Sequence, residues 1–99
     1  MVFKSKVCNA IKNKQVVKFY YDGHVRIVEP HISGETSNGN AVLSAYRVSG
    51  YSESKSEPSW RYYSLDKISQ WNTMDEVFEK ARRGYNRNDS KIKTIYCRL

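Results

Sequence analysis

Apolar and polar positions recur with different periods along the chain, and these periods predict one helix followed by short strands. Near the N-terminus, Phe3, Val7, Ala10 and Ile11 recur at helical spacing, with lysines on the opposite face. This pattern predicts an amphipathic helix over residues 3–13 that packs one face onto a sheet.

The strongest local signal is a β-hairpin. Residues 16–21 and 24–28 are rich in β-branched and aromatic side chains, and Asp22-Gly23 between them suits a two-residue hairpin turn. This turn predicts a register that is fully specified: Tyr21 opposite His24, Phe19 opposite Arg26, and Val17 opposite Val28. Both faces mix apolar and polar residues, so the pattern does not decide which face is the core.

Turn residues divide the next part of the chain into further strands. Pro30 predicts the end of the second strand, because proline has no N–H for the ladder. Residues 33–40 are typical of a loop, and residues 41–51 predict a third strand in which Leu43, Tyr46 and Val48 pack. The segments that follow are predicted in this order: a polar loop over 52–59, a strand over 60–65, a tight turn over 66–68 and a short fifth strand near 70–71.

The last part of the chain predicts a second helix and a final strand. Thr73-Met74-Asp75-Glu76 has the form of a capping box, and Gly84 follows Arg82-Arg83 as a left-handed cap, so we expect a helix over 74–83. Residues 86–90 are typical of a loop, and alternation over 91–97 predicts a strand at a sheet edge.

Composition fits one compact domain over residues 1–99. The chain is 39% hydrophobic and 13% aromatic, which is enough for one modest core. It has no apolar run long enough to cross a bilayer and no secretory signal at the start, so we expect a cytoplasmic protein without membrane contact. Only Cys8 and Cys97 are present, and we expect both as reduced thiols in or near the core.

Positive charge gathers at the two ends of this basic chain, whose net charge is +7. Residues 1–21 hold five lysines and no acidic residue, and residues 82–99 hold six basic residues against Asp89 alone, so each end carries +5. If the fold brings the ends together, their fields add and attract phosphate in a salt-dependent way. The alternative is a solvated charged surface that only keeps the protein soluble.

An ordered set of motifs over about residues 5–71 resembles the WYL domain family. Residues 10–14 look like the lead-in helix of the family and residues 19–21 like its first strand, while Arg26-Ile27-Val28-Glu29-Pro30 resembles its Arg-x-Val-x-Pro segment. Residues 61–68, Arg-Tyr-Tyr-Ser-Leu-Asp-Lys-Ile, carry the most specific part of the resemblance. The Trp-Tyr-Leu run that names the family stands here as Ala41-Val42-Leu43.

This resemblance implies a mostly β fold with some α: a small SH3-like or Sm-like β-barrel with an N-terminal helix, to which residues 72–99 add a C-terminal helix and an edge strand. WYL domains occur mostly in transcription regulators and are thought to sense nucleic acid or nucleotide-like ligands. We expect no room for a DNA-reading helix-turn-helix before the barrel. The resemblance therefore implies a stand-alone ligand sensor or adaptor with a regulatory role and no catalysis.

The candidate ligand site combines cations, which bind phosphate oxygens, with tyrosine rings, on which bases stack. Such a mixture suits single-stranded nucleic acid. Its members are Arg26, Arg61, Tyr46, Tyr63, His24 and Lys67. The alternative is that the tyrosines belong to the core and that the arginines lie over apolar surface with their charged ends in water.

A secondary basic patch at the chain ends would follow a phosphate backbone without reading bases. Its members are Lys12, Lys14, Arg82, Arg83 and Arg87. We expect no cofactor and no metal, because His24 and His31 have no ligand spacing with each other and the glycines form no phosphate loop. Two other functions stay open: an oligomerisation or protein-interaction module that uses an edge strand, and a small ribonuclease.

Overall fold

The computed structural model describes residues 2–50 and 59–99, and of residues 49 and 50 the backbone only. Within these ranges the chain forms one α-helix, one short 3-10 helix and six strands. In chain order they are α1 (Lys4–Lys12), β1 (Gln15–Tyr21), β2 (His24–Glu35), β3 (Ala41–Gly50), β4 (Ser59–Ser64), η1 (Leu65–Lys67), β5 (Ser69–Val77) and β6 (Thr94–Arg98).

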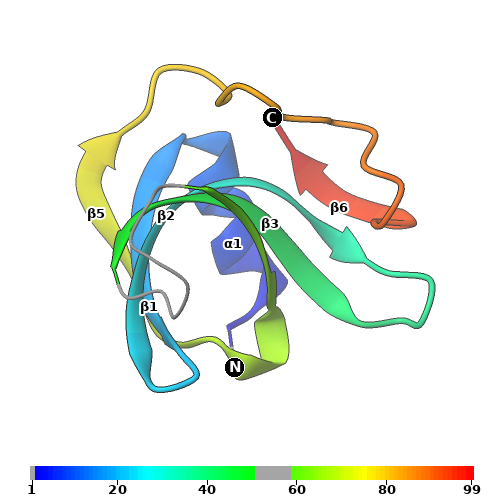
Figure 1. Cartoon of the computed structure of the whole chain (residues 1–99), viewed down its shortest axis with the longest axis horizontal. Coiled ribbons are helices and arrows are strands. Elements are labelled where there is room, and N and C mark those ends of the chain that lie inside the picture. The colour runs from blue at the N-terminus through cyan, green and yellow to red at the C-terminus, as the bar shows by residue number, and fades with distance from the viewer. Residues whose placement is uncertain (1, 51–58) are drawn as a thin grey trace.

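The strands form one antiparallel sheet in the order β4-β3-β2-β1-β5, and β6 pairs with the second half of β2. In Figure 1 this sheet curves around the space in which α1 lies. The expected mostly β fold with an N-terminal helix is confirmed. Among the described residues β4 and β5 do not pair with each other, so the sheet is not closed and the expected barrel is not confirmed.

The main core lies between α1 and the concave side of the sheet, which we call the inner face. Val7, Ala10 and Ile11 of α1 are buried there, as the helical spacing predicts, whereas Phe3 of the same pattern is the N-cap and is 70% exposed. Phe19 of β1 and Leu43 of β3 are buried in the same cluster. Of the packing residues expected in the third strand, Leu43 is fully buried, whereas Tyr46 and Val48 are only partly buried.

The hairpin prediction is confirmed in turn and register. Tyr21 pairs with His24, Phe19 with Arg26, and Val17 with Val28. Asp22 and Gly23 have φ values of 52° and 79°, the left-handed backbone that this hairpin turn requires. The predicted fourth strand and the turn after it are also confirmed, whereas the polar loop over residues 52–58 lies outside the described residues.

Two predictions about the second strand are wrong: it does not end at Pro30, and residues 33–35 are not loop, because β2 continues to Glu35. Along one edge, β1 pairs with β2 as far as Val28, and β6 pairs from Ile32 onward. Pro30 lies between these two partners on that edge, and on the other edge it pairs with Ala45 of β3 beside a register shift, the kind of irregularity at which a strand tolerates proline.

The helix predicted over residues 74–83 is also wrong. Strand β5 instead continues to Val77, which pairs with Gln15, and the Phe78 amide donates to the Lys14 carbonyl at 2.9 Å. A capping box contributes about 1 kcal/mol. The structure gains more from the pairing of six further strand residues, 72–77, and from burial of Phe78, which is 7% exposed.

Residues 78–93, which we call the C-terminal strap, contain neither helix nor strand and lead from β5 to β6. Figure 1 shows this segment running along the outside of the sheet from the yellow end of β5 to the red β6. The final strand is confirmed but shorter than expected, since it starts at Thr94. It pairs with β2 alone among the described strands, as an edge strand does.

The two cysteines form a disulfide, so the expectation of reduced thiols is wrong. Cys8 of α1 and Cys97 of β6 have their Cα atoms 5.7 Å apart, although 89 positions separate them in sequence. The sheet brings the chain ends together, which a count of cysteines does not reveal. The described ranges contain no helix of the length and apolarity that a membrane crossing needs.

Candidate anion-binding sites

Strands β3 and β4 divide the predicted site residues between two faces. Leu43 pairs with Tyr63 and Ala45 with Arg61, and these side chains belong to the inner face. The alternate positions, where Tyr46 pairs with Trp60, belong to the opposite side, which we call the outer face. The predicted grouping of Tyr46 with Arg61 and Tyr63 is therefore wrong.

On the inner face, Tyr21 and Tyr63 form an aromatic pair next to Arg26. Their ring centroids are 4.9 Å apart in an edge-to-face arrangement, and the Tyr21 hydroxyl accepts a hydrogen bond from the Ser64 amide at 3.0 Å. Arg26 donates from Nη2 to the Tyr21 carbonyl at 3.2 Å, and its guanidinium carbon lies 5.9 Å from the Tyr21 ring centroid. Tyr63 is buried, as the alternative interpretation of this tyrosine expected.

The strand register places three arginines from three neighbouring strands on the same face as Tyr63. Burial raises the pKa of Tyr63, and the positive charges of three side chains oppose this rise: Arg26 of β2, Arg47 of β3 and Arg61 of β4. The Tyr63 hydroxyl is buried and makes no hydrogen bond within the described part of the chain. We call Arg26, Arg47 and Arg61 the inner arginine cluster.

Arg47 is the member of this cluster that the sequence interpretation missed. It is fully buried and continues the inward alternation of Leu43 and Ala45. The sequence did contain a signal for Arg47: the strand alternation assigns this position to the core, where an arginine is rare. Of the other predicted members, His24 lies opposite Tyr21 at the end of the hairpin, and Lys67 is exposed on η1, outside the cluster.

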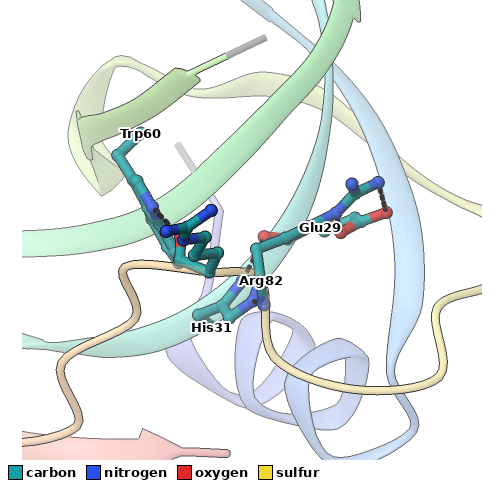
Figure 2. A network of polar contacts seen from close by, with 5 residues as sticks. Glu29, His31, Trp60 and Arg82 are labelled. Atoms are coloured by element: carbon teal, nitrogen blue, oxygen red, sulfur yellow. Dashed lines mark hydrogen bonds and ion pairs between the residues drawn. The ribbon is translucent and has the colours of Figure 1, made fainter.

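The outer face holds a buried polar network that fixes the strap, shown in Figure 2. The Arg82 amide donates to His31 Nε2 at 3.0 Å, so Nε2 carries no proton. The proton is therefore on Nδ1, which donates to the Glu29 carbonyl at 2.7 Å. Burial lowers the pKa of His31, which agrees with a neutral imidazole in this network.

Aromatic rings and an ion pair complete this network. The His31 ring stacks on Phe78 with centroids 5.2 Å apart and meets Trp60 edge-on at 4.7 Å. The Arg82 guanidinium contacts both carboxylate oxygens of Glu29, at 2.6 and 2.9 Å, and lies 4.8 Å from the Tyr46 ring centroid. Arg82 and Tyr46, both predicted as ligand residues, therefore hold the strap on the sheet.

A cavity of about 310 Å³ lies between the strap and the outer face. The sheet contributes Ser44, Trp60 and Tyr62, and the strap contributes Tyr85, Asn86 and Asp89. The Tyr62 hydroxyl donates to Asp89, and burial together with this hydrogen bond raises the pKa of Tyr62 to about 12. The sequence interpretation missed this site. It predicted a helix over 74–83, and a helix there gives no reason to expect that the strap returns over β3 and β4.

The secondary basic patch is divided between two places. Lys12 and Lys14 line a groove of about 460 Å³ beside the Cys8–Cys97 disulfide, together with Arg98. Arg83 and Arg87 are exposed on the strap, and Arg87 Nε donates to the Leu99 carbonyl at 3.3 Å. The two basic ends of the chain thus meet, as the charge argument required for their fields to add.

The part of the chain that the structure describes contains no group of three or more His, Cys, Asp or Glu residues placed to hold a metal ion. Comparison with models of protein families found no matching family, and comparisons with curated proteins and with solved structures found no match either.

Proposed function

We propose that this chain is a non-catalytic module that binds nucleic acid, preferably single-stranded, or a nucleotide-like anionic ligand, in a regulatory or adaptor role. The observation that carries the proposal is that strand register puts Arg26, Arg47 and Arg61 on the inner face with Tyr63, where their charges act on its buried hydroxyl. We further propose that the fold is a WYL-like module of the Sm-like barrel type. The strand order β4-β3-β2-β1-β5 with a helix before β1 supports this assignment.

Phosphate is the ligand chemistry that this cluster fits best. A guanidinium presents planar N–H donors that match two phosphate oxygens at once, and it stays charged at every physiological pH. Three such groups close together in a partly water-excluded site attract an anion far more strongly than exposed lysines do. The Tyr63 hydroxyl, which makes no hydrogen bond within the described part of the chain, adds a donor on the same face.

The motifs of the family resemblance support the same site. Arg26 belongs to the Arg-x-Val-x-Pro segment and Arg61 begins the most specific segment of the resemblance. Strand register puts both arginines on the inner face, as it does Tyr63, which supports a shared site. Two motifs that lie far apart in sequence thus contribute to one candidate phosphate site.

Fluorescence anisotropy of labelled single-stranded oligonucleotides and of a labelled cyclic dinucleotide tests the proposal. Arg61→Gln is the informative variant because Arg61 is partly exposed and its removal leaves the core intact. The matched control is Lys67→Gln, which removes one positive charge from the exposed turn η1. We expect Arg61→Gln to weaken binding about tenfold, a loss typical of one charge-assisted contact, and Lys67→Gln to change it little.

Two outcomes would overturn the proposal. One is the absence of binding by the unmodified chain at low salt, since phosphate contacts are strongest there. The other is an equal loss of affinity in both variants, which would make binding a matter of net charge alone. A salt-resistant oligomer in light scattering, combined with no binding, would favour the edge-strand assembly alternative.

A further inference from the structure

The cavity between the strap and the outer face has the composition of a base-binding pocket. We propose that it accepts one nucleobase of a single strand, guanine in preference to the others, and that the strand reaches it by passing over the edge of β4. This inference rests on the proposed function, because it extends the phosphate site of the inner arginine cluster to a base-reading site on the opposite face.

The size and the walls of the cavity fit a nucleobase. Its volume of about 310 Å³ lies at the lower end of the range for small-ligand pockets. Trp60 and Tyr85 stack on each other, with ring centroids 6.2 Å apart and an interplanar angle of 20°, so they form one aromatic wall, and Tyr62 forms another. Flat aromatic walls bind bases by stacking, which contributes about 1–3 kcal/mol per base.

The polar groups of the cavity favour a base with two adjacent donors. One carboxylate oxygen of Asp89 accepts from the Tyr62 hydroxyl, and the other accepts from the Lys91 amide at 3.0 Å. A carboxylate has about four acceptor positions, so each oxygen can accept one more hydrogen bond. Guanine presents N1–H and N2–H side by side on its Watson–Crick edge, whereas adenine, cytosine and uracil present fewer adjacent donors there.

The cations around the cavity favour nucleic acid over an ammonium ligand, which aromatic walls beside a carboxylate would otherwise suit. Lys91 Nζ lies 4.8 Å from the Tyr62 ring centroid, so a cation already lies over that ring. Arg83 and Lys91 are both exposed on the strap. These charges repel a cationic ligand and attract the phosphates that flank a bound base.

The strap lies close to the sheet at this cavity because of Gly84. Its φ of 90° is left-handed, and a Cβ at this position would lie 3.0 Å from Trp60 Nε1. That indole nitrogen donates to the Arg83 carbonyl at 3.0 Å, which fixes the strap backbone against the ring. Both walls of the cavity are therefore held in place without a ligand, and less ordering is needed when a base binds.

The position of β4 allows one strand of nucleic acid to reach both sites. In the described ranges β4 pairs with β3 alone, so its other edge is not covered by a strand. Arg61 belongs to the inner face, while its neighbours Trp60 and Tyr62 line the outer cavity. An oligonucleotide that crosses this edge can place a phosphate at Arg61 and a base at Tyr62, whereas a single nucleoside can occupy only the cavity.

Titration with the four ribonucleosides tests the pocket apart from the phosphate site, because nucleosides carry no phosphate. Quenching of tryptophan fluorescence reports binding, and Trp60→Phe shows whether the signal comes from the cavity. The informative variant is Asp89→Asn, whose amide keeps one acceptor and can still bond Tyr62 and the Lys91 amide. The matched control is Asp66→Asn, an exposed carboxylate on η1 that does not line the cavity.

We expect guanosine to bind more tightly than the other nucleosides and Asp89→Asn to reduce its affinity about tenfold, the loss expected for one charge-assisted hydrogen bond. Asp66→Asn should leave guanosine binding unchanged, while Arg61→Gln should weaken binding of a guanine-containing oligonucleotide. Equal affinity for all four nucleosides, no quenching of Trp60, or stronger binding of tetramethylammonium would overturn the pocket assignment. If guanosine binds but Arg61→Gln leaves oligonucleotide binding intact, the phosphate site fails while the pocket stands.

Discussion

Removal of the Cys8–Cys97 disulfide tests the most consequential difference between the sequence expectation and the structure. The bond joins positions 89 apart, so it closes almost the entire chain into one loop. In the chain-entropy model, a loop of this length lowers the free energy of folding by about 4.6 kcal/mol, and measured values for native disulfides lie at about 2–5 kcal/mol. The folded state should survive this loss, because β6 also pairs with β2 and the Tyr96 hydroxyl donates to Glu35 at 2.6 Å.

Urea unfolding of the oxidised chain, the reduced chain and Cys8→Ser/Cys97→Ser gives the three free energies that the test needs. We expect the reduced chain and the double variant to agree with each other and to be less stable than the oxidised chain by about 2–5 kcal/mol. Mass spectrometry after alkylation in denaturant identifies the oxidised sample independently. Equal midpoints for all three samples, or free thiols in the chain purified without reductant, would refute the assigned disulfide and restore the expectation of reduced cysteines.

Three further predictions concern the strap and β6. Because burial lowers the pKa of His31, the unfolded chain binds more protons than the folded chain below about pH 6.5, so stability should fall as pH decreases from there, by at most about 1.4 kcal/mol per pH unit. In His31→Asn, urea unfolding measured at several pH values should lack this part of the slope. Arg82→Gln should lower the free energy of unfolding, measured in urea, by about 1–2 kcal/mol. It leaves the buried Glu29 carboxylate unpaired, but the side chain that it removes is itself 45% exposed. Gly34→Ala should lower the stability measured by thermal unfolding by about 3 kcal/mol, because its Cβ would lie 2.0 Å from the Thr94 carbonyl oxygen. The control Ser37→Ala, in the exposed turn, should change stability little.

Local signals predicted the first half of the fold well. The hairpin register follows from Asp22-Gly23 and from the period of its strands, and both depend on residues that are neighbours in sequence. The same holds for α1, whose buried residues Val7 and Ile11 show the helical period. These elements needed no information about distant partners.

The failures have a common physical cause, which is pairing between distant segments. The capping-box pattern at Thr73 describes a helix that an isolated peptide would favour, yet Thr73 pairs with Val17 in the sheet. Likewise, Pro30 does not end β2, because β2 changes its neighbour on one edge at that point and has a register shift in its pairing with β3 on the other. Tertiary pairing outweighs propensities that differ by about 1 kcal/mol or less.

Much of the inner candidate site could be predicted, whereas the outer one could not. Arg26 and Arg61 stood out because they belong to recognisable motifs, and Arg47 follows from strand alternation once the inward face is known. The outer cavity forms only because the strap returns over Trp60 and Tyr62. The contact that holds it there joins Trp60 to Arg83, 23 positions further along the chain. No local pattern encodes that return, because the residues of the strap form no regular element.

The two candidate sites should contribute differently to binding, and affinity at several salt concentrations and selectivity among bases measure these contributions separately. Phosphate contacts supply affinity and its dependence on salt, whereas contacts to base edges supply selectivity. Arg61 and Tyr62 are consecutive residues whose side chains belong to opposite faces of β4. Loss of the Arg61 charge should therefore reduce the slope of log affinity against log salt and leave the order of base preference intact. Loss of the Asp89 charge should change that order and leave the slope nearly intact, and a variant that changed both quantities together would mean that the ligand occupies one continuous site.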